Sequence, residues 1–332
     1  MLTTAVQFSA PRAVELIDLE LPAPVEGQAL VSSLYSGISG GTEMLAYRGE
    51  IDPDLPLDES IGALSGTFSW PFRYGYSVVG RIHESRCSLQ PGATVFCFHP
   101  HQAHLLPEQE DMIDVSGIDP RIATLLPLVE TALQISLDAG PVARQPVVVM
   151  GLGAVGILTG ALLHRAGATV LAADPLPWRR AVARSFSLSS VDPAELKSHV
   201  DDLTEGRGTT LIVEVSGNPK ALSEALELTA HEGTVMVASW FGTKHVSLPL
   251  GGAFHRRRLT LRSTQVSTIP ARLTAEWTKK RRVETSPSLM KELPLDLLAT
   301  HEFPLPQVSR AFHAVDSSTD GLIHAAINYQ EV

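Results

Sequence analysis

The stretch Val147-Val-Val-Met-Gly-Leu-Gly-Ala-Val-Gly156 decides the fold. Four apolar residues predict a buried strand, and three glycines follow it directly before an apolar helix. In this spacing the first glycine permits a tight turn, the second lets the backbone approach a pyrophosphate, and the third permits close helix packing. The N–H groups at the start of the helix attract phosphate. The stretch therefore predicts a dinucleotide-binding turn, whose expected contacts are Gly151, Gly153, Ala154, Val155 and Gly156.

A carboxylate follows at the distance that such a turn requires. The next apolar segment, residues 169–173, ends on Asp174, about 20 residues beyond the glycines. A carboxylate there accepts hydrogen bonds from the ribose hydroxyls and repels a 2′-phosphate, so NAD is favoured over NADP. The alternative is that Asp174 caps a helix beginning near Pro177. Arg179 and Arg180 lie close enough to soften the preference, because an arginine can bind a 2′-phosphate.

Strand and helix patterns alternate after Gly140, which predicts a parallel sheet with helices on both faces, the doubly wound α/β architecture of the Rossmann fold. The expected strands are residues 147–150, 169–173, 211–215 and 233–239. The expected helices are residues 156–166, 178–186 and 219–229.

The first part of the chain has short strand patterns separated by Pro and Gly, which predicts a β-rich domain. Its expected strands are residues 5–8, 13–18, 29–35, 76–83 and 94–98. A linking helix is expected over 121–137, beginning at Asp119-Pro120 and kinked or split at Pro127. The final segment, 298–329, is expected to return to the β-rich domain. The predicted division is a first domain 1–118, a dinucleotide-binding domain 119–270, and a return segment 271–332.

Composition excludes several classes of protein. The 36 acidic residues exceed the 26 Lys and Arg residues, giving a net charge of -10, which argues against a nucleic-acid surface. No apolar run approaches the ~20 residues that cross a bilayer. Two cysteines, Cys87 and Cys97, build no disulfide framework and cannot alone close a structural zinc site. Since Met1 to Pro11 also lacks the layout of a secretory signal, we expect a cytoplasmic protein without a membrane partner.

With these residues in view, the chain resembles the medium-chain dehydrogenase/reductase superfamily, which includes the zinc alcohol dehydrogenases and the quinone reductases. The likeness covers nearly the whole chain, in the segments 14–22, 37–43, 75–80, 92–95, 205–208, 213–219 and 233–237. It implies a GroES-like β-barrel domain completed by the C-terminal segment, a Rossmann domain between the two parts, and substrate bound in the interdomain cleft. It also places Ser216 among the cofactor contacts.

The resemblance fails at the metal ligands. Zinc members carry a cysteine in the segment matching Gly37 to Glu43 and a histidine in the turn matching 75–80, where this chain offers Ser39 or Gly40 and Tyr76. Hydroxyl, phenol and glycine do not replace thiolate and imidazole on zinc. The chain looks most like a zinc-lacking subgroup that includes bacteriochlorophyllide a dehydrogenase, and we expect no zinc. The rival hypothesis is a metal bound by His99, His101 and His104, perhaps with Cys97 or Glu130.

Without zinc, hydroxyl donors must stabilise the oxygen of a secondary alcohol or ketone during hydride transfer. By resemblance, the candidates are Thr42, where a proton relay begins, and Tyr76, at the former ligand position. Tyr76 could instead be a packed aromatic residue. Glu43 and Glu130 are candidate acids, and either could instead hold structure; Glu130, in an apolar helix, needs a partner. Residues 255–258, His-Arg-Arg-Arg, could reach an anionic substrate or the cofactor, or could be surface charge.

Two other functions compete with a zinc-independent, NAD(P)-dependent alcohol dehydrogenase. One is a zinc-independent quinone or enoyl-type reductase of an activated double bond, and the other is a non-catalytic nucleotide-binding protein. By analogy with the superfamily, we also expect a homodimer in which sheet edges near the strand after Gly233 pair across a two-fold axis.

Overall fold

A computed structural model describes residues 1–330 as two units. The first unit comprises residues 1–127 together with the chain from 284 onward, and the second comprises 128–283. These limits differ from the predicted boundaries at 118 and 270. Helix α2 (Pro120–Ala123) contacts strands β3 (Ala29–Ile38) and β4 (Val78–Ser85), so it belongs to the first unit.

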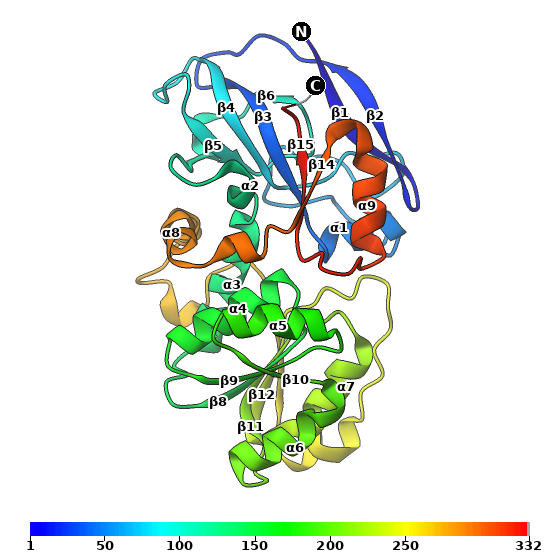
Figure 1. Ribbon diagram of the computed structural model, residues 1–332, viewed down its shortest axis with the longest axis vertical. Helices are drawn as coiled ribbons and strands as arrows, with labels where there is room; N and C mark the ends of the chain where they lie inside the picture. The colour runs from blue at the N-terminus through cyan, green and yellow to red at the C-terminus, as the bar shows by residue number, and fades with distance from the viewer. Residues whose placement is uncertain (331–332) are drawn as a thin grey trace. The chain divides into compact units, whose positions relative to one another are not determined.

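The second unit contains a parallel six-stranded sheet in the order β10-β9-β8-β11-β12-β13 (Figure 1). This is the strand order of a doubly wound dinucleotide-binding fold, so the predicted fold class is confirmed. The strands are β8 (Pro146–Met150), β9 (Thr169–Ala173), β10 (Ser189–Val191), β11 (Thr209–Glu214), β12 (Thr229–Val237) and β13 (Thr260–Ser263). The sequence patterns predicted four of them; β10 and β13 are short, and β13 is largely exposed, so neither shows a buried apolar run.

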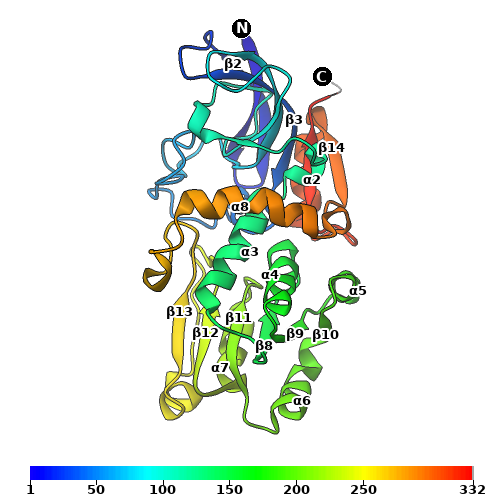
Figure 2. The ribbon, with the colours of Figure 1, turned by 90° about the vertical axis from the view of Figure 1, so that its left-hand side faces the viewer.

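Helices cover both faces of this sheet (Figure 2). They are α4 (Ala154–Arg165), α5 (Pro177–Ser185), α6 (Pro193–Thr204) and α7 (Pro219–Leu228), with short turns η2 (Leu250–Phe254) and η3 (Ala271–Leu273). Three begin with proline at the first helical position, where its missing N–H is no loss. Asp192 and Asn218 cap α6 and α7, each accepting a hydrogen bond from a backbone N–H.

The first unit is built on an antiparallel sheet in the order β14-β15-β3-β4-β5-β7, with β6 paired to β3 and β14 parallel to β15. A hairpin of β1 (Leu2–Ala10) and β2 (Ala13–Glu20) lies beside it. The remaining strands are β5 (Thr94–Cys97), β6 (His104–Leu105), β7 (Met112–Asp114), β14 (His301–Pro304) and β15 (Ala325–Asn328). Because β15 pairs with β3, the C-terminal segment completes the N-terminal sheet, as the sequence predicted.

The linking helix is split as expected. Asp119 caps α2, and α3 (Leu126–Ala139) begins one residue before Pro127, so the proline starts a helix and does not kink one. The other helices are α1 (Thr42–Arg48), α8 (Lys279–Glu292) and α9 (Val308–Asp316), with single turns η1 (Gln109–Asp111), η4 (Leu295–Leu297) and η5 (Leu305–Gln307). The sequence patterns predicted none of these six.

Aromatic residues form much of the core of the first unit. The Phe8 ring stacks on Phe72 at 5.2 Å between centroids and meets Phe312 edge-on at 5.2 Å. Phe312 lies in α9 and Phe8 in β1, so this core joins the two ends of the chain within one unit.

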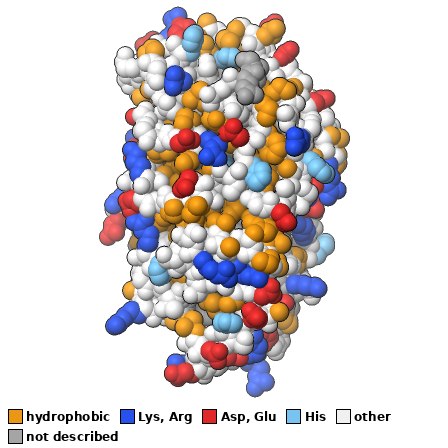
Figure 3. All heavy atoms as spheres, in the orientation of Figure 1, with side chains coloured by type: hydrophobic (Ala, Val, Ile, Leu, Met, Phe, Trp, Pro, Cys, Tyr) orange, Lys and Arg blue, Asp and Glu red, His pale blue; other side chains and the backbone are white. Residues whose placement is uncertain are grey.

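The surface carries charges of both signs. On the face shown in Figure 3, Lys and Arg side chains are interspersed with Asp and Glu side chains and form no single basic patch. Among residues 1–330, no helix is both long and apolar enough to cross a membrane.

Candidate functional site

The glycine-rich turn joins β8 to α4 and leaves open space at its middle glycine. Gly151 has φ 105°, and a Cβ there would lie 2.7 Å from the Ser216 Cα, so only glycine fits. A Cβ on Gly156 would collide with the carbonyl oxygen of Gly151. At Gly153 a Cβ would meet nothing within 4 Å, and no side chain caps α4. The first N–H groups of α4 therefore remain available to a phosphate group.

Ser216 belongs to the loop that packs against this turn. Its N–H and its hydroxyl both donate to Glu214 Oε1, at 2.7 and 2.6 Å. Glu214 is fully buried, and its second oxygen has no hydrogen-bond partner. Glu214 could not be identified from the sequence, because a carboxylate at the end of an apolar strand is typical of the start of a loop.

Asp174 fastens the glycine-rich turn from the end of β9. One carboxylate oxygen accepts from Leu152 N at 2.8 Å, and the other from Leu176 N at 2.9 Å. The residue that caps α5 is Leu176, which offers no side-chain acceptor, so Asp174 is not a helix cap. Its two hydrogen bonds connect the glycine-rich turn, at Leu152, to the residue before α5, Leu176.

Two arginines follow Asp174 and differ in their partners. The guanidinium of Arg179 lies 3.7 Å from Asp174 Oδ2 and over the Trp178 ring, 5.1 Å from its centroid. Arg180 donates to the Asp174 carbonyl at 2.6 Å and to the Asp192 carboxylate at 3.1 Å. The guanidinium of Arg180 therefore makes its hydrogen bonds to residues of the same unit. Nε of Arg179 and the indole nitrogen of Trp178 are buried without hydrogen-bond partners.

In the first unit, Thr42 and Tyr76 come together with Ser39. Thr42 is the first residue of α1, and Tyr76 precedes β4 by two residues. Burial, and then the charge of Glu43, raise the pKa of the Tyr76 phenol, whereas hydrogen bonding with the side chains of Ser39 and Thr42 lowers it. The net pKa is raised, so the phenol is a protonated donor at neutral pH. We call Ser39, Thr42 and Tyr76 the hydroxyl cluster.

Glu43 sits beneath this cluster in a fully buried polar chain. Its two oxygens accept from Ser39 N at 2.8 Å and meet His101 Nε2 at 2.8 Å. The other ring nitrogen of His101 lies 2.7 Å from Ser36 Oγ, which is 2.9 Å from the hydroxyl of Tyr329. Since Glu43 and His101 are both fully buried, their pairing positions the segment that carries Ser39.

The three histidines of residues 99–104 do not converge. His101 binds Glu43, and His99 lies 2.9 Å through Nδ1 from the carbonyl of Pro100. Burial lowers the pKa of His99 to about 4, so it is neutral. His104, in β6, has a buried Nδ1 without a partner. Among residues 1–330, no three His, Cys, Asp or Glu side chains gather as a metal site. The hydroxyl cluster also lacks the thiolate or imidazole ligands that zinc requires, so these residues do not fit zinc.

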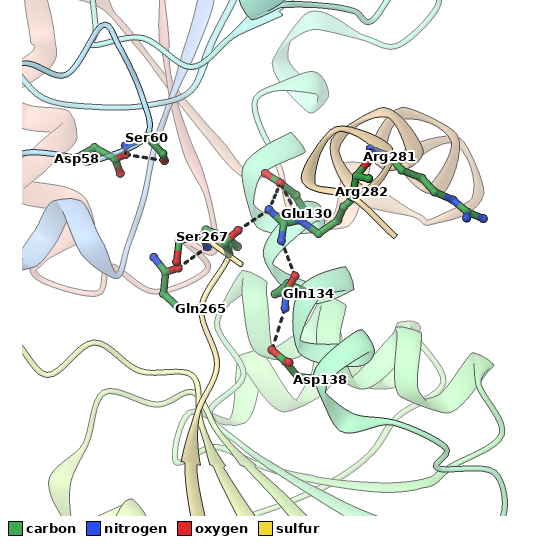
Figure 4. Close-up of polar contacts among 11 residues, drawn as sticks. Asp58, Ser60, Glu130, Gln134, Asp138, Gln265, Ser267, Arg281 and Arg282 are labelled. Atoms are coloured by element: carbon green, nitrogen blue, oxygen red, sulfur yellow. Dashed lines mark hydrogen bonds and ion pairs between the residues drawn. The ribbon is translucent and has the colours of Figure 1, made fainter. Parts of the chain in front are cut away.

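The carboxylate of Glu130, which lies in an apolar helix, forms an ion pair with Arg282. It lies in α3 of the second unit, and its Oε1 accepts from Arg282 Nε at 2.9 Å and Nη2 at 2.7 Å (Figure 4). Arg282 also donates to Gln134 and to the carbonyl of Val266. Both charged side chains are almost completely buried. Burial raises the pKa of Glu130, and Arg282 opposes that rise. Every donor nitrogen of Arg282 is used, so the pair has the geometry of a structural brace.

The basic residues 255–258 lie away from the glycine-rich turn. Arg257 donates to the carbonyls of Glu227 and Thr229, where α7 ends and β12 begins. Arg258 pairs with Glu232 at 2.9 Å. Because β8 and β12 run parallel, the start of β12 and the carboxyl end of β8 lie at opposite ends of the strands. The hypothesis that this cluster reaches the cofactor is therefore wrong for Arg257 and Arg258, which cap a helix and form surface charge.

Comparison with known proteins gives matches along the whole chain. Residues 154–280 match the family model described as "Zinc-binding dehydrogenase". The chain is 26% identical, over 97% of its own length and 97% of the other, to 2-desacetyl-2-hydroxyethyl bacteriochlorophyllide A dehydrogenase from Cereibacter sphaeroides.

Two similar solved structures contain nicotinamide cofactors. An alcohol dehydrogenase from Escherichia coli CFT073 in complex with NADH has a TM-score of 0.76 at 14% identity, with 99% of each chain covered. A dehydrogenase from Sinorhizobium meliloti 1021 bound to NADP has a TM-score of 0.76 at 17% identity, covering 99% of this chain and 100% of that one. These similarities show that the two-unit fold is one found in dehydrogenases that bind NAD(P).

Proposed function

Because the chain belongs to the medium-chain dehydrogenase/reductase superfamily, we propose that it is an NAD(P)-dependent oxidoreductase that interconverts a secondary alcohol and a ketone without zinc. The observation that carries the proposal is that the chain keeps a dinucleotide turn while Ser39 and Tyr76 stand, by resemblance, where zinc-dependent members carry their ligands. Relatives named as dehydrogenases support the reaction class.

The second unit supplies the features that would hold the cofactor. The open position at Gly153 and the uncapped N-terminus of α4 suit a pyrophosphate, and the carboxylate of Asp174 suits the adenosine ribose. When bound, nicotinamide supplies the hydride chemistry. We propose NAD as the preferred cofactor, because Asp174 would repel a 2′-phosphate. Arg179 limits that preference, since its guanidinium lies beside the same carboxylate.

The first unit supplies the donors that would act on the substrate oxygen. A protonated phenol at Tyr76 can donate a hydrogen bond to a carbonyl oxygen as negative charge develops on it. The side chains of Thr42 and Ser39, which lower the pKa of that phenol, can orient it and give its proton a route to neighbouring hydroxyls. Glu43 holds the Ser39 backbone from below and acts as a positioning residue. Donation from these hydroxyls would stabilise the substrate oxygen without a metal ion, and the residues of the hydroxyl cluster are poor zinc ligands.

Asp174→Gly is expected to weaken NADH binding about tenfold to a hundredfold, since hydrogen bonds to a charged acceptor contribute about 1.5–3 kcal/mol each. Binding of NADPH should weaken less, because a repulsive charge is removed together with the acceptor. Fluorescence titration with both cofactors measures the two affinities. Asp202→Asn, on the exposed side of α6, is the control and should bind as the unmodified protein does. Tighter binding of NADPH than NADH before mutation would overturn the NAD preference.

We also propose a homodimer, in which the contact is made by strand β13 and not by the strand that contains Gly233. The strand that contains Gly233 is β12, which lies between β11 and β13 and has no free edge. The sheet ends at β10 and at β13, and at β13, the neighbour of β12, unpaired N–H and C=O groups can pair with a second copy. Light scattering at micromolar concentration is expected to give twice the mass of one chain, and a monomer would contradict this assembly.

A further inference from the structure

A cavity of about 180 Å³ opens in the first unit, in the long segment between α1 and β4. Its lining combines three hydroxyl side chains, Ser65, Thr67 and Ser69, with the guanidinium-bearing residue Arg73. Phe72 and Pro100 supply apolar walls. Neither the sequence motifs nor the hydroxyl cluster account for this arrangement.

Arg73 is a cation without a counter-charge. Its hydrogen bond to Gln102 Oε1, at 2.9 Å, uses one of the five N–H donors of a guanidinium. Within residues 1–330, no carboxylate forms an ion pair with it. Burial lowers the pKa of Arg73, and no carboxylate acts in the opposite direction. A partly desolvated charge of this kind gains stability from an anion that completes its hydrogen bonds.

The hydroxyls beside Arg73 can add donors. Thr67 Oγ1 accepts from Ser69 N at 3.4 Å, so its own proton remains free to donate. Ser65 is exposed at the cavity and has no hydrogen bond to any described residue. Ser69 already donates to the carbonyl of Pro53 and contributes mainly shape. Two free hydroxyl donors and an unpaired guanidinium match the acceptors of a small oxyanion.

We propose that this cavity binds a carboxylate or phosphate group through Arg73, Ser65 and Thr67. The guanidinium would bind two oxygens side by side, a geometry that lysine cannot reproduce. Since the protein carries a net charge of -10, an anion here is held by local donors and gains nothing from the overall field.

The site is separate from the hydroxyl cluster. Its lining includes Arg73, Ser65 and Thr67 and none of the residues of the hydroxyl cluster. The anion could therefore be a free ion or a remote group of the substrate, and experiment can distinguish these two sources.

The test begins with calorimetric titration of inorganic phosphate at low ionic strength. We expect saturable binding that weakens at least about tenfold in Arg73→Gln, from the loss of charge-assisted hydrogen bonds. Arg73→Lys should bind phosphate with intermediate affinity, because lysine keeps the positive charge but cannot donate two parallel hydrogen bonds. Arg81→Gln, at an exposed position of β4, is the matched control and should bind as the unmodified protein does. Thermal melting of each variant shows whether it is folded.

A second measurement identifies the source of the anion and depends on the proposed function. Initial rates with 3-hydroxybutyrate and with 2-butanol compare a charged with a neutral secondary alcohol. If the anion belongs to the substrate, Arg73→Gln reduces kcat/KM for the acid and not for 2-butanol. If the anion is free, phosphate binding depends on Arg73 while both rates are unaffected. Absent phosphate binding, or phosphate binding that Arg73→Gln leaves unchanged, overturns the proposal even if the protein proves to be an active dehydrogenase.

Discussion

Tyr76→Phe is expected to lower turnover about a hundredfold or more while cofactor affinity stays nearly unchanged. The reason is that the phenol donates where charge develops in the transition state, and loss of one such donor costs about 10²–10³ in rate. Burial raises the pKa of Tyr76, so the donor is protonated at neutral pH and its removal has a full effect. Initial rates and an NADH titration on the same preparation measure the two quantities.

Tyr74→Phe is the matched control for this experiment. Tyr74 is also buried and its ring touches that of Tyr76, but neither Ser39 nor Thr42 lowers the pKa of its phenol. Its replacement removes one oxygen from the same aromatic group, so turnover should remain close to that of the unmodified protein. Full activity in Tyr76→Phe would reduce Tyr76 to a packing residue, which was the alternative drawn from the sequence.

Arg282→Met should destabilise the protein by about 3–5 kcal/mol at neutral pH, because it leaves the Glu130 carboxylate buried without its cation. Urea denaturation measures the loss in free energy of unfolding. Replacing both partners, in Glu130→Leu with Arg282→Met, should recover much of the stability, since no buried charge then remains. A single variant as stable as the unmodified protein would show that the pair is no brace.

The pH dependence of Arg282→Met gives a second check. Burial raises the pKa of Glu130 and Arg282 opposes the rise, so removal of the arginine raises that pKa further. A carboxyl whose folded pKa exceeds its unfolded value gains stability as pH falls through the folded pKa. The deficit of Arg282→Met should therefore shrink toward acid pH and grow as pH rises.

The doubly wound sheet could be predicted from the sequence because its central strands are buried on both faces. Residues 147–150 and 211–213 are continuous apolar runs, and glycine spacing identified the turn after the first of them. Strand β13 escaped prediction, since three of its four residues are exposed or polar. The strand after Gly233, near which we expected a dimer contact, therefore lies inside the sheet, beside β13.

The hydroxyl cluster was predicted only through resemblance. Thr42 and Tyr76 are separated by 34 positions, and no periodicity links a helix start to a turn before a strand. His101 had been grouped with its neighbours His99 and His104, yet it binds Glu43. Contacts between residues this distant depend on the packing of β3, α1 and the loop after β5, which local patterns do not encode.

For Glu130, the sequence predicted that a partner is needed but did not identify that partner. A carboxylate in an apolar helix demanded a partner, and this expectation was correct. The partner, Arg282, lies in the basic segment 279–282, which on composition alone reads as a solvated face. Only the fold distinguishes the buried member of that segment from its exposed neighbours.

Turnover of chelator-treated protein tests the central claim most directly. The near-ultraviolet absorbance of reduced nicotinamide is followed with a panel of secondary alcohols and ketones, after dialysis against chelator and elemental analysis for zinc. We predict that the protein holds far less than about one zinc per chain and turns over with an unchanged rate. Activity that disappears in chelator and returns when zinc is added would contradict the account.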